Sequence, residues 1–379
     1  MLPVIKHFGI LCLGIFGMIC MLKVKCKYFK VVTPIVLFFS FCLLILVLVT
    51  GQSTNGASRW LTFFGLQFQP SEIAKGAVVL AVAQILSAMQ TDNGTGADKR
   101  ALKFVAFTSA PFILLIGLEN LSTAMLLCIT ILFMMIIGRV PNIQIGRIIG
   151  IVALLGGLAF TVIEVAGTDK QAKNPDNTLT ETVTEEEEDG TVSKIFHRAD
   201  TWKSRINKFL FPNYNTPEDV DLDKDAQVAH ANIAIASSNV VGKGPGNSTE
   251  RDYLSQAFSD FIFAIIVEEM GIVGAIFVAF LYIMLLFRTS SVASRCENNF
   301  PAFLAMGLAI LLVTQALFNM CVAVGLAPVT GQPLPLVSRG GTSTIINCLY
   351  VGIILSISRT AKKRESYKGD RMEDKLVMA

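Results

Sequence analysis

Runs of about 20 apolar residues recur along this 379-residue chain, and they constrain its fold more than any other feature. A run of that length spans the hydrocarbon core of a bilayer as an α-helix, in which the backbone polar groups bond to one another. Hydrophobic residues make up 53% of the chain and charged residues only 16%, whereas a soluble domain carries about 25% charged residues. The sequence therefore predicts an all-α polytopic membrane protein and excludes a soluble multidomain enzyme.

Nine segments have the length and composition of transmembrane helices. They are residues 5–23, 31–50, 71–91, 103–119, 121–138, 145–166, 258–288, 301–323 and 340–359. The expected organisation is six helices in 1–166, a large extracytoplasmic loop over 167–257, three helices in 258–360 and a tail over 361–379. Within the loop, the acidic stretch at about 176–193 is expected to be disordered.

Lysine and arginine residues are distributed unevenly among the short connections. Cytoplasmic loops of membrane proteins collect these residues, and the connections 51–70 and 324–339 contain only Arg59 and Arg339. We therefore expect these two connections and segment 167–257, with 16 acidic and 10 basic residues, to lie outside and the C-terminus inside. Nine spans then place the N-terminus outside without a recognisable signal peptide, so we expect a tenth helix upstream in the natural protein.

Residues that bind metals through nitrogen or sulfur are sparse. The eight cysteines lie in or beside apolar runs without a C-x-x-C pair, and the three histidines are far apart. This pattern supports neither a disulfide framework nor a zinc site. It leaves open a hard cation, Mg²⁺ or Mn²⁺, held together with a substrate diphosphate. Nucleic-acid binding is disfavoured because no basic stripe with interleaved aromatic residues lies outside the cytoplasmic segments.

Polar residues near the expected outer ends of the helices are the candidates for chemistry, because an ionisable group in a membrane is costly unless it is paired or used. Glu72 and Lys75 lie three residues apart on one helical face. They are either a mutual ion pair that makes the helix insertable or a pair that orients substrate. Arg59 and Trp60 are either interfacial anchors or substrate contacts.

Basic residues in the extracytoplasmic loop form two further candidates. Arg198 and Arg205 lie in a stretch with the spacing of an interfacial amphipathic helix, and they bind either a diphosphate or, as the sequence slightly favours, lipid headgroups. The stretch GKGPGNS, residues 242–248, resembles a phosphate-binding glycine loop only loosely. We interpret it as a turn, with Lys243 as a candidate anion contact.

Three carboxylates occur in AFSDFIFAIIVEEMGIVG, residues 257–274. Asp260 is either the N-cap of the apolar helix that follows or a partly desolvated base at the outer membrane face. Glu268 and Glu269 lie deeper in the same span, where they need partners such as Lys75 or backbone donors. We interpret these two residues first as a structural hydrogen-bond or ion-pair node.

The stretch GLAPVTGQPLPLVSRGGTS, residues 325–343, contains three prolines and four glycines. This composition forbids a continuous helix and predicts a re-entrant or broken element over 325–341 that is packed in protein and lines a cavity. Arg339 and the backbone of Gly340 and Gly341 are candidates to hold an anion at the start of the next helix.

Together, four motifs resemble the SEDS family (shape, elongation, division and sporulation), whose members include FtsW, RodA and SpoVE. In order along the chain, they are NGASRW, FQPSEIAK, SDFIFAIIVEEMG and PVTGQPLPLVSRGGTS. The resemblance covers nearly the whole chain, from about residue 5. Of the family's ten helices, only the first has no counterpart here. It implies a peptidoglycan glycosyltransferase that polymerises lipid II, a disaccharide-pentapeptide on a polyprenyl diphosphate. It further implies a site on the outer face of the bacterial cytoplasmic membrane and a class B penicillin-binding protein as partner.

By motif position, the resemblance makes Asp260 the counterpart of the family's essential aspartate. Trp60, Glu72, Lys75, Glu268 and Ser338 fall on other motif positions. The family pattern Pro-Glu-x-His-Thr-Asp reads Ser-Gln-Ala-Phe-Ser-Asp at 255–260 here, so it supports the carboxylate but no neighbouring imidazole.

The implied chemistry needs a carboxylate near the acceptor hydroxyl and positive charge near the departing diphosphate. Asp260 supplies the carboxylate, either as a base or as a ligand of substrate or metal. The candidates for the positive charge are Arg59, Lys75, Arg198, Arg205, Lys243 and Arg339. The stretch FGLQFQPSE favours the FtsW branch, with other division proteins as partners, over RodA-like elongation. A lipid II flippase and a non-catalytic scaffold are the alternatives, and the flippase is disfavoured because the candidates crowd the outer side.

Overall fold

The computed structural model describes residues 2–50, 52–54, 57–63, 66–91, 96–150, 226–254 and 258–377. The chain divides into two compact units, residues 1–145 with 221–379 and residues 146–220. The first unit contains nearly all of the described residues, and the second is described only over 146–150. The predictions for 176–193, Arg198 and Arg205 therefore lie outside the described residues.

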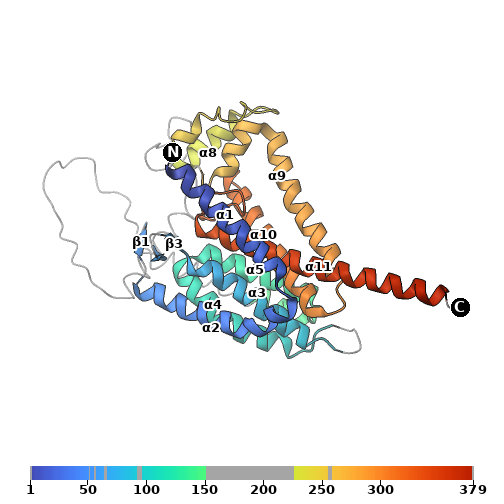
Figure 1. The fold of residues 1–379 in the computed structure, drawn as a ribbon. Helices are drawn as coiled ribbons and strands as arrows, with labels where there is room; N and C mark the ends of the chain where they lie inside the picture. The colour runs from blue at the N-terminus through green and yellow to red at the C-terminus, as the bar shows by residue number, and fades with distance from the viewer. Residues whose placement is uncertain are drawn as a thin grey trace, which may run out of the picture. The chain divides into compact units, whose positions relative to one another are not determined.

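The first unit is mostly helical (Figure 1). Its α-helices are α1 (Leu2–Lys23), α2 (Cys26–Thr50), α3 (Pro70–Ala88), α4 (Ala101–Glu119), α5 (Leu121–Ile137), α8 (Ala226–Ala236), α9 (Ile262–Ser294), α10 (Asn299–Ala323) and α11 (Thr342–Val377). Among the described residues, six helices are long and apolar enough to cross a membrane, namely α2, α3, α4, α9, α10 and the first 20 residues of α11. The chain is therefore a multi-pass membrane protein. Of the predicted segment 145–166, the part beyond Gly150 lies outside the described residues.

Helix α3 lies at the centre of the packing, in contact with α2, α4, α5 and α10. Its sequence is rich in alanine and glycine, and small residues let membrane helices approach closely. Gly76 illustrates the requirement, because a Cβ at this position would lie 2.5 Å from the ring of Tyr350 on α11. The small residues of α3 thus allow this helix to be buried inside the unit, although its first two turns contain the polar residues Glu72 and Lys75.

The expectation of a purely helical fold is wrong for the connection between α2 and α3. It contains a small antiparallel sheet of three strands, β1 (Gln52–Thr54), β2 (Ala57–Phe63) and β3 (Leu66–Phe68). The sequence carries a signal for it, because Asn55-Gly56 between alternating residues is the dipeptide most typical of a β-hairpin.

The predicted span over 258–288 corresponds to α9, which is long and apolar enough to cross a membrane, but its helical backbone is interrupted at Gly271. The backbone there has φ 67° and ψ −167°, a conformation that L-residues with a Cβ rarely adopt. The break exposes the carbonyl groups of Glu268 and Glu269, which accept hydrogen bonds from Lys243 N (2.9 Å) and Gly244 N (2.8 Å). The GKGPGNS stretch is thus a turn that fills the break, as its simpler interpretation predicted.

Candidate functional site

The first residues of α3, α9 and α11 meet at one end of the helical unit. The amide of Arg339 donates to the carbonyl oxygen of Phe258 at 2.7 Å, and Thr342 Oγ1 donates to the carbonyl oxygen of Gln67 at 3.0 Å. Residues 324–341, which connect α10 to α11, are not helical, as the prolines and glycines predicted. The tertiary structure therefore brings together three polar stretches that are far apart in the sequence.

Asp260 lies in the turn before α9 and is half-buried. Ser259 Oγ donates to Asp260 Oδ1 at 2.9 Å, and Ser338 Oγ donates to the carbonyl oxygen of Ser259 at 2.5 Å. The N-cap interpretation of Asp260 is wrong, because Phe261, one residue later, is the N-cap residue of α9. The carboxylate thus lies in a turn that Ser259 and Ser338 hold at the end of the unit.

Buried polar side chains anchor the segment 324–341. A broken helix leaves backbone groups without partners, and in a membrane protein these groups must bond to neighbouring protein. The anchoring bonds run from Gln315 Nε2 to Pro333 O (3.0 Å), from Gln332 Nε2 to Thr123 Oγ1 (2.7 Å), from the Tyr282 hydroxyl to Pro335 O, and from Leu334 N to Ser338 Oγ (2.7 Å). Ser338 accordingly binds both its own segment and the turn that contains Asp260.

Glu72 and Lys75 form a mutual ion pair with a distance of 2.9 Å, and their side chains are 2% and 0% exposed. Lys75 Nζ also donates to Gln315 Oε1 at 2.8 Å. The geometry therefore fits a mutual ion pair that allows the helix to be buried, and a role of the pair in orienting substrate stays a prediction. Because Lys75 pairs with Glu72 and Gln315, it is not the partner of Glu268, which was one of the two alternatives suggested for that carboxylate.

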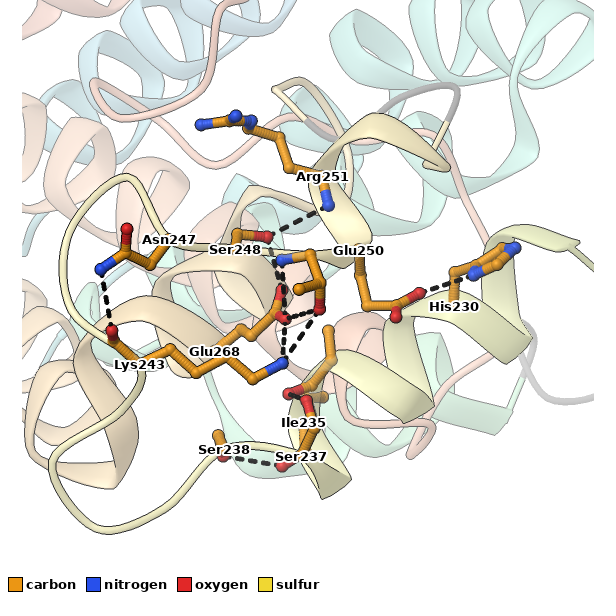
Figure 2. Close-up of polar contacts among 12 residues, drawn as sticks. His230, Ile235, Ser237, Ser238, Lys243, Asn247, Ser248, Glu250, Arg251 and Glu268 are labelled. Carbon is orange, nitrogen blue, oxygen red and sulfur yellow. Dashed lines mark hydrogen bonds and ion pairs between the residues drawn. The ribbon is translucent and has the colours of Figure 1, made fainter.

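Glu268 is the centre of a second polar cluster (Figure 2). Its side chain is 0% exposed and pairs with Lys243 Nζ at 2.6 Å. Ser248 Oγ (2.5 Å), Thr249 N (3.1 Å) and Thr249 Oγ1 (2.8 Å) also donate to the carboxylate. These contacts have the geometry of an ion-pair and hydrogen-bond node, and the anion that Lys243 contacts is a carboxylate of the protein itself. Glu269 is only partly buried.

Glu268→Gln is expected to lower the free energy of unfolding by about 2–3 kcal/mol, because it replaces charge-assisted hydrogen bonds by weaker neutral ones. Glu269→Gln is the matched control, since it makes the same change at the adjacent, partly buried position and should cost less than about 0.5 kcal/mol. Thermal unfolding in detergent measures both variants. An equal loss of unfolding free energy in the two variants would contradict a stabilising role for the Glu268 cluster.

His230 and Glu250 form a further contact that the sequence analysis missed. His230 Nδ1 and Glu250 Oε2 are 2.6 Å apart (Figure 2). The imidazole also stacks on the ring of Tyr253. This contact ties α8 to the short 3-10 helix η2 (Glu250–Asp252). Together with the Glu268 cluster, it organises the segment that precedes Asp260.

The remaining candidates occupy different positions. Arg59 and Trp60 lie on β2. Trp60 pairs with Gln52 and is partly buried, whereas the structure describes only the backbone of Arg59. Arg339 is exposed at the end of the segment that Ser338 anchors. Within the described ranges, no three His, Cys, Asp or Glu side chains come together as a group that could hold a metal ion.

Gln315 and Asn319 on α10 are two site residues that were not predicted from the sequence. Both are 1% exposed, and both donate to carbonyl groups of the segment 324–341. The available signal was their spacing, because two amides four residues apart in an apolar span lie on one helical face.

Fold and site together define a multi-pass helical membrane protein in which the first residues of several helices and a non-helical segment lie beside a half-buried carboxylate. The family of FtsW, RodA and SpoVE cell cycle proteins matches residues 2–363, and the chain belongs to this family.

Two curated relatives carry the name of the enzyme class. The peptidoglycan glycosyltransferase MrdB of Escherichia coli K12 is 28% identical over 354 residues, which are 93% of this chain and 84% of MrdB. The probable peptidoglycan glycosyltransferase FtsW of Geobacter sp. M18 is 30% identical over 331 residues, 84% of this chain and 76% of the relative. These names confirm the predicted class, an enzyme of the peptidoglycan glycosyltransferase type. The similar identities do not separate the two branches.

Solved structures share the fold. The rod shape determining protein RodA of Thermus thermophilus has a TM-score of 0.61 and 22% identity, over 94% of this chain and 88% of RodA. A chain from a peptidoglycan synthase complex, described as coordinating polymerization and crosslinking, has a TM-score of 0.70 and 23% identity, over 95% of this chain and 90% of its own length. The mostly helical membrane fold is thereby confirmed.

Proposed function

We propose that this chain polymerises lipid II into glycan strands, with Asp260 as the essential carboxylate. The observation that carries the proposal is the position of Asp260, half-buried where the starts of α3, α9 and α11 converge with the broken segment 324–341. The names of the curated relatives support the same activity.

Glycosyl transfer requires that the acceptor hydroxyl lose a proton while the diphosphate departs. Asp260 accepts this proton in the proposed reaction, and Ser259 orients its carboxylate through the 2.9 Å hydrogen bond. Arg339 is the described basic candidate that is exposed beside Ser338, so we assign it to the departing diphosphate. The Lys75 side chain is 0% exposed and is therefore less accessible to a substrate.

The site end of the helices faces the cell wall in this proposal, and the opposite end faces the cytoplasm. Support comes from the basic connections that the sequence assigns to the cytoplasm. Cys26, Arg295 and Thr360 line one pocket, and Ser356 Oγ donates to the carbonyl oxygen of Val24 at 2.5 Å. The basic connections therefore lie together at the far ends of helices whose first residues form the site.

A class B penicillin-binding protein is the proposed partner, and division, with further division proteins, is the proposed process. The peptidoglycan synthase complex among the structural neighbours supports an assembly of this kind. Affinity purification of the tagged chain from its own cells tests both points. A division-specific penicillin-binding protein is the expected partner, and an elongation-specific one would assign the chain to the RodA branch.

The activity itself is tested with labelled lipid II in liposomes that contain the purified chain and its penicillin-binding partner. Glycan strands, separated by gel electrophoresis, are the expected product. Translocation of labelled lipid II without polymer would overturn the proposal in favour of a flippase. Polymer that forms equally well without the chain would overturn it too.

A further inference from the structure

Asn319 contacts the reactive turn from inside the helical unit. It lies one turn before the end of α10 and is 1% exposed. Its Nδ2 donates to the carbonyl oxygen of Asp260 at 2.7 Å and to the carbonyl oxygen of Gln332 at 2.7 Å. Both partners are carbonyl oxygens, which only accept hydrogen bonds, so the amide nitrogen must face them.

This amide limits the separation of two segments that are distant in the sequence. The carbonyl oxygens of Asp260 and Gln332 lie within 2.7 Å of the same nitrogen, so they cannot be further apart than twice that distance. Gln332 belongs to the broken segment that continues to Ser338 and Arg339. The amide thereby couples the carboxylate to the segment that carries the candidate diphosphate contact.

The two hydrogen bonds that Asn319 donates account for an asparagine at this buried position, whereas packing alone does not. An amide buried in an apolar helix costs free energy unless it is fully hydrogen-bonded, and a leucine of similar size would pack at that place. Asn319 Oδ1 accepts no hydrogen bond from the described residues, whereas the nitrogen is used twice. Gln315 and Gln332 already anchor the broken segment, but neither of their side chains contacts Asp260.

We propose that Asn319 is a positioning residue for glycosyl transfer, which holds Asp260 at a set distance from the segment of Ser338 and Arg339. The inference rests on the proposed function, because it assigns Asp260 the reactive role. Asn319 acts through the backbone of Asp260 and touches no substrate. Its loss should therefore lower kcat and leave KM almost unchanged, since a displacement of about 1 Å at a reactive group costs on the order of a hundredfold in rate.

The test compares Asn319→Leu with Gln332→Leu in the liposome assay with the penicillin-binding partner. Both variants replace a buried amide by leucine, but Gln332→Leu leaves the two hydrogen bonds of Asn319 in place. Asn319→Leu is expected to reduce kcat about tenfold to a hundredfold with KM within twofold. Gln332→Leu is expected to keep kcat within about threefold of the unsubstituted protein. Its thermal unfolding midpoint should fall by about as much as that of Asn319→Leu.

Equal losses of kcat in the two variants would overturn the inference, because a structural anchor affects both alike. An unchanged kcat in Asn319→Leu would overturn it as well. If Asn319→Leu does not fold, Asn319→Asp takes its place, because it removes the amide donors and keeps the side-chain shape. The same reduction of kcat is expected of it, and an unchanged kcat would likewise overturn the inference. An inactive Asp260→Asn variant beside a fully active Asn319 variant would refute only this inference, whereas a fully active Asp260→Asn would refute the proposed role of Asp260 itself.

Discussion

Asp260→Asn should abolish glycan-strand synthesis and leave the fold intact. Asparagine has the same shape, and its Oδ1 still accepts the hydrogen bond from Ser259 Oγ, but the amide accepts no proton from an acceptor hydroxyl. A positioned general base contributes about 10²–10⁴-fold to rate, so polymer from this variant should fall to about 1% or less. Strand synthesis from labelled lipid II and thermal unfolding in detergent are the two measurements.

Asp252→Asn is the control for the Asp260 variant. The Asp252 side chain is 78% exposed and pairs with Arg251 at 3.4 Å, in the segment that leads to the same turn. Removal of this charge should leave polymer synthesis within about twofold, because an exposed ion pair contributes little. Undiminished polymer from Asp260→Asn would refute the role of the carboxylate. An equal loss in Asp252→Asn would point instead to the overall charge of the segment.

Lys75→Met is expected to destabilise the protein by about 3–5 kcal/mol, because it leaves the Glu72 carboxylate buried without its counter-ion. The Glu72 side chain is 2% exposed, and the ammonium group also serves Gln315. A double variant, Glu72→Met with Lys75→Met, removes both charges and should recover most of the loss. Lys103→Met, at an exposed position of α4, should change the unfolding midpoint little.

The double variant also separates the two roles that the sequence leaves open for the Glu72 and Lys75 pair. If the pair only permits α3 to be buried, the stable double variant keeps its rate of strand synthesis. If the pair orients substrate, the double variant folds and is inactive. A double variant less stable than either single variant would contradict the ion-pair explanation altogether.

The sequence predicted the positions of most helices, since apolar length is a property that each segment carries alone. The bounds of α3 and α10 differ by only a few residues from the segments 71–91 and 301–323. It missed the β-strands between α2 and α3 because hydropathy outweighed the Asn-Gly turn signal. It also missed the break at Gly271, because the conformation of one glycine depends on the turn that packs against it.

Candidate residues were found wherever a charge or a helix breaker stood out in an apolar context, as Asp260, Glu268 and residues 325–341 do. Their partners were not found. Lys75 was one of the partners suggested for Glu268, yet Lys243 pairs with it, because both lysines are plausible counter-ions and only packing distinguishes them. Uncharged amides such as Asn319 were overlooked because they perturb hydropathy less than a charged group does.

By itself, the sequence determined that this chain is a helical membrane protein of the FtsW, RodA and SpoVE family, and it singled out Asp260. Apolar length, loop charge and ordered motifs are local or linear properties, and no packing is needed to read them. Only the tertiary structure decided which groups share a hydrogen bond. Lys75 and Gln315 are separated by 240 residues and Ser259 and Ser338 by 79. The free energy of such contacts depends on burial and geometry, which exist only once the helices have packed.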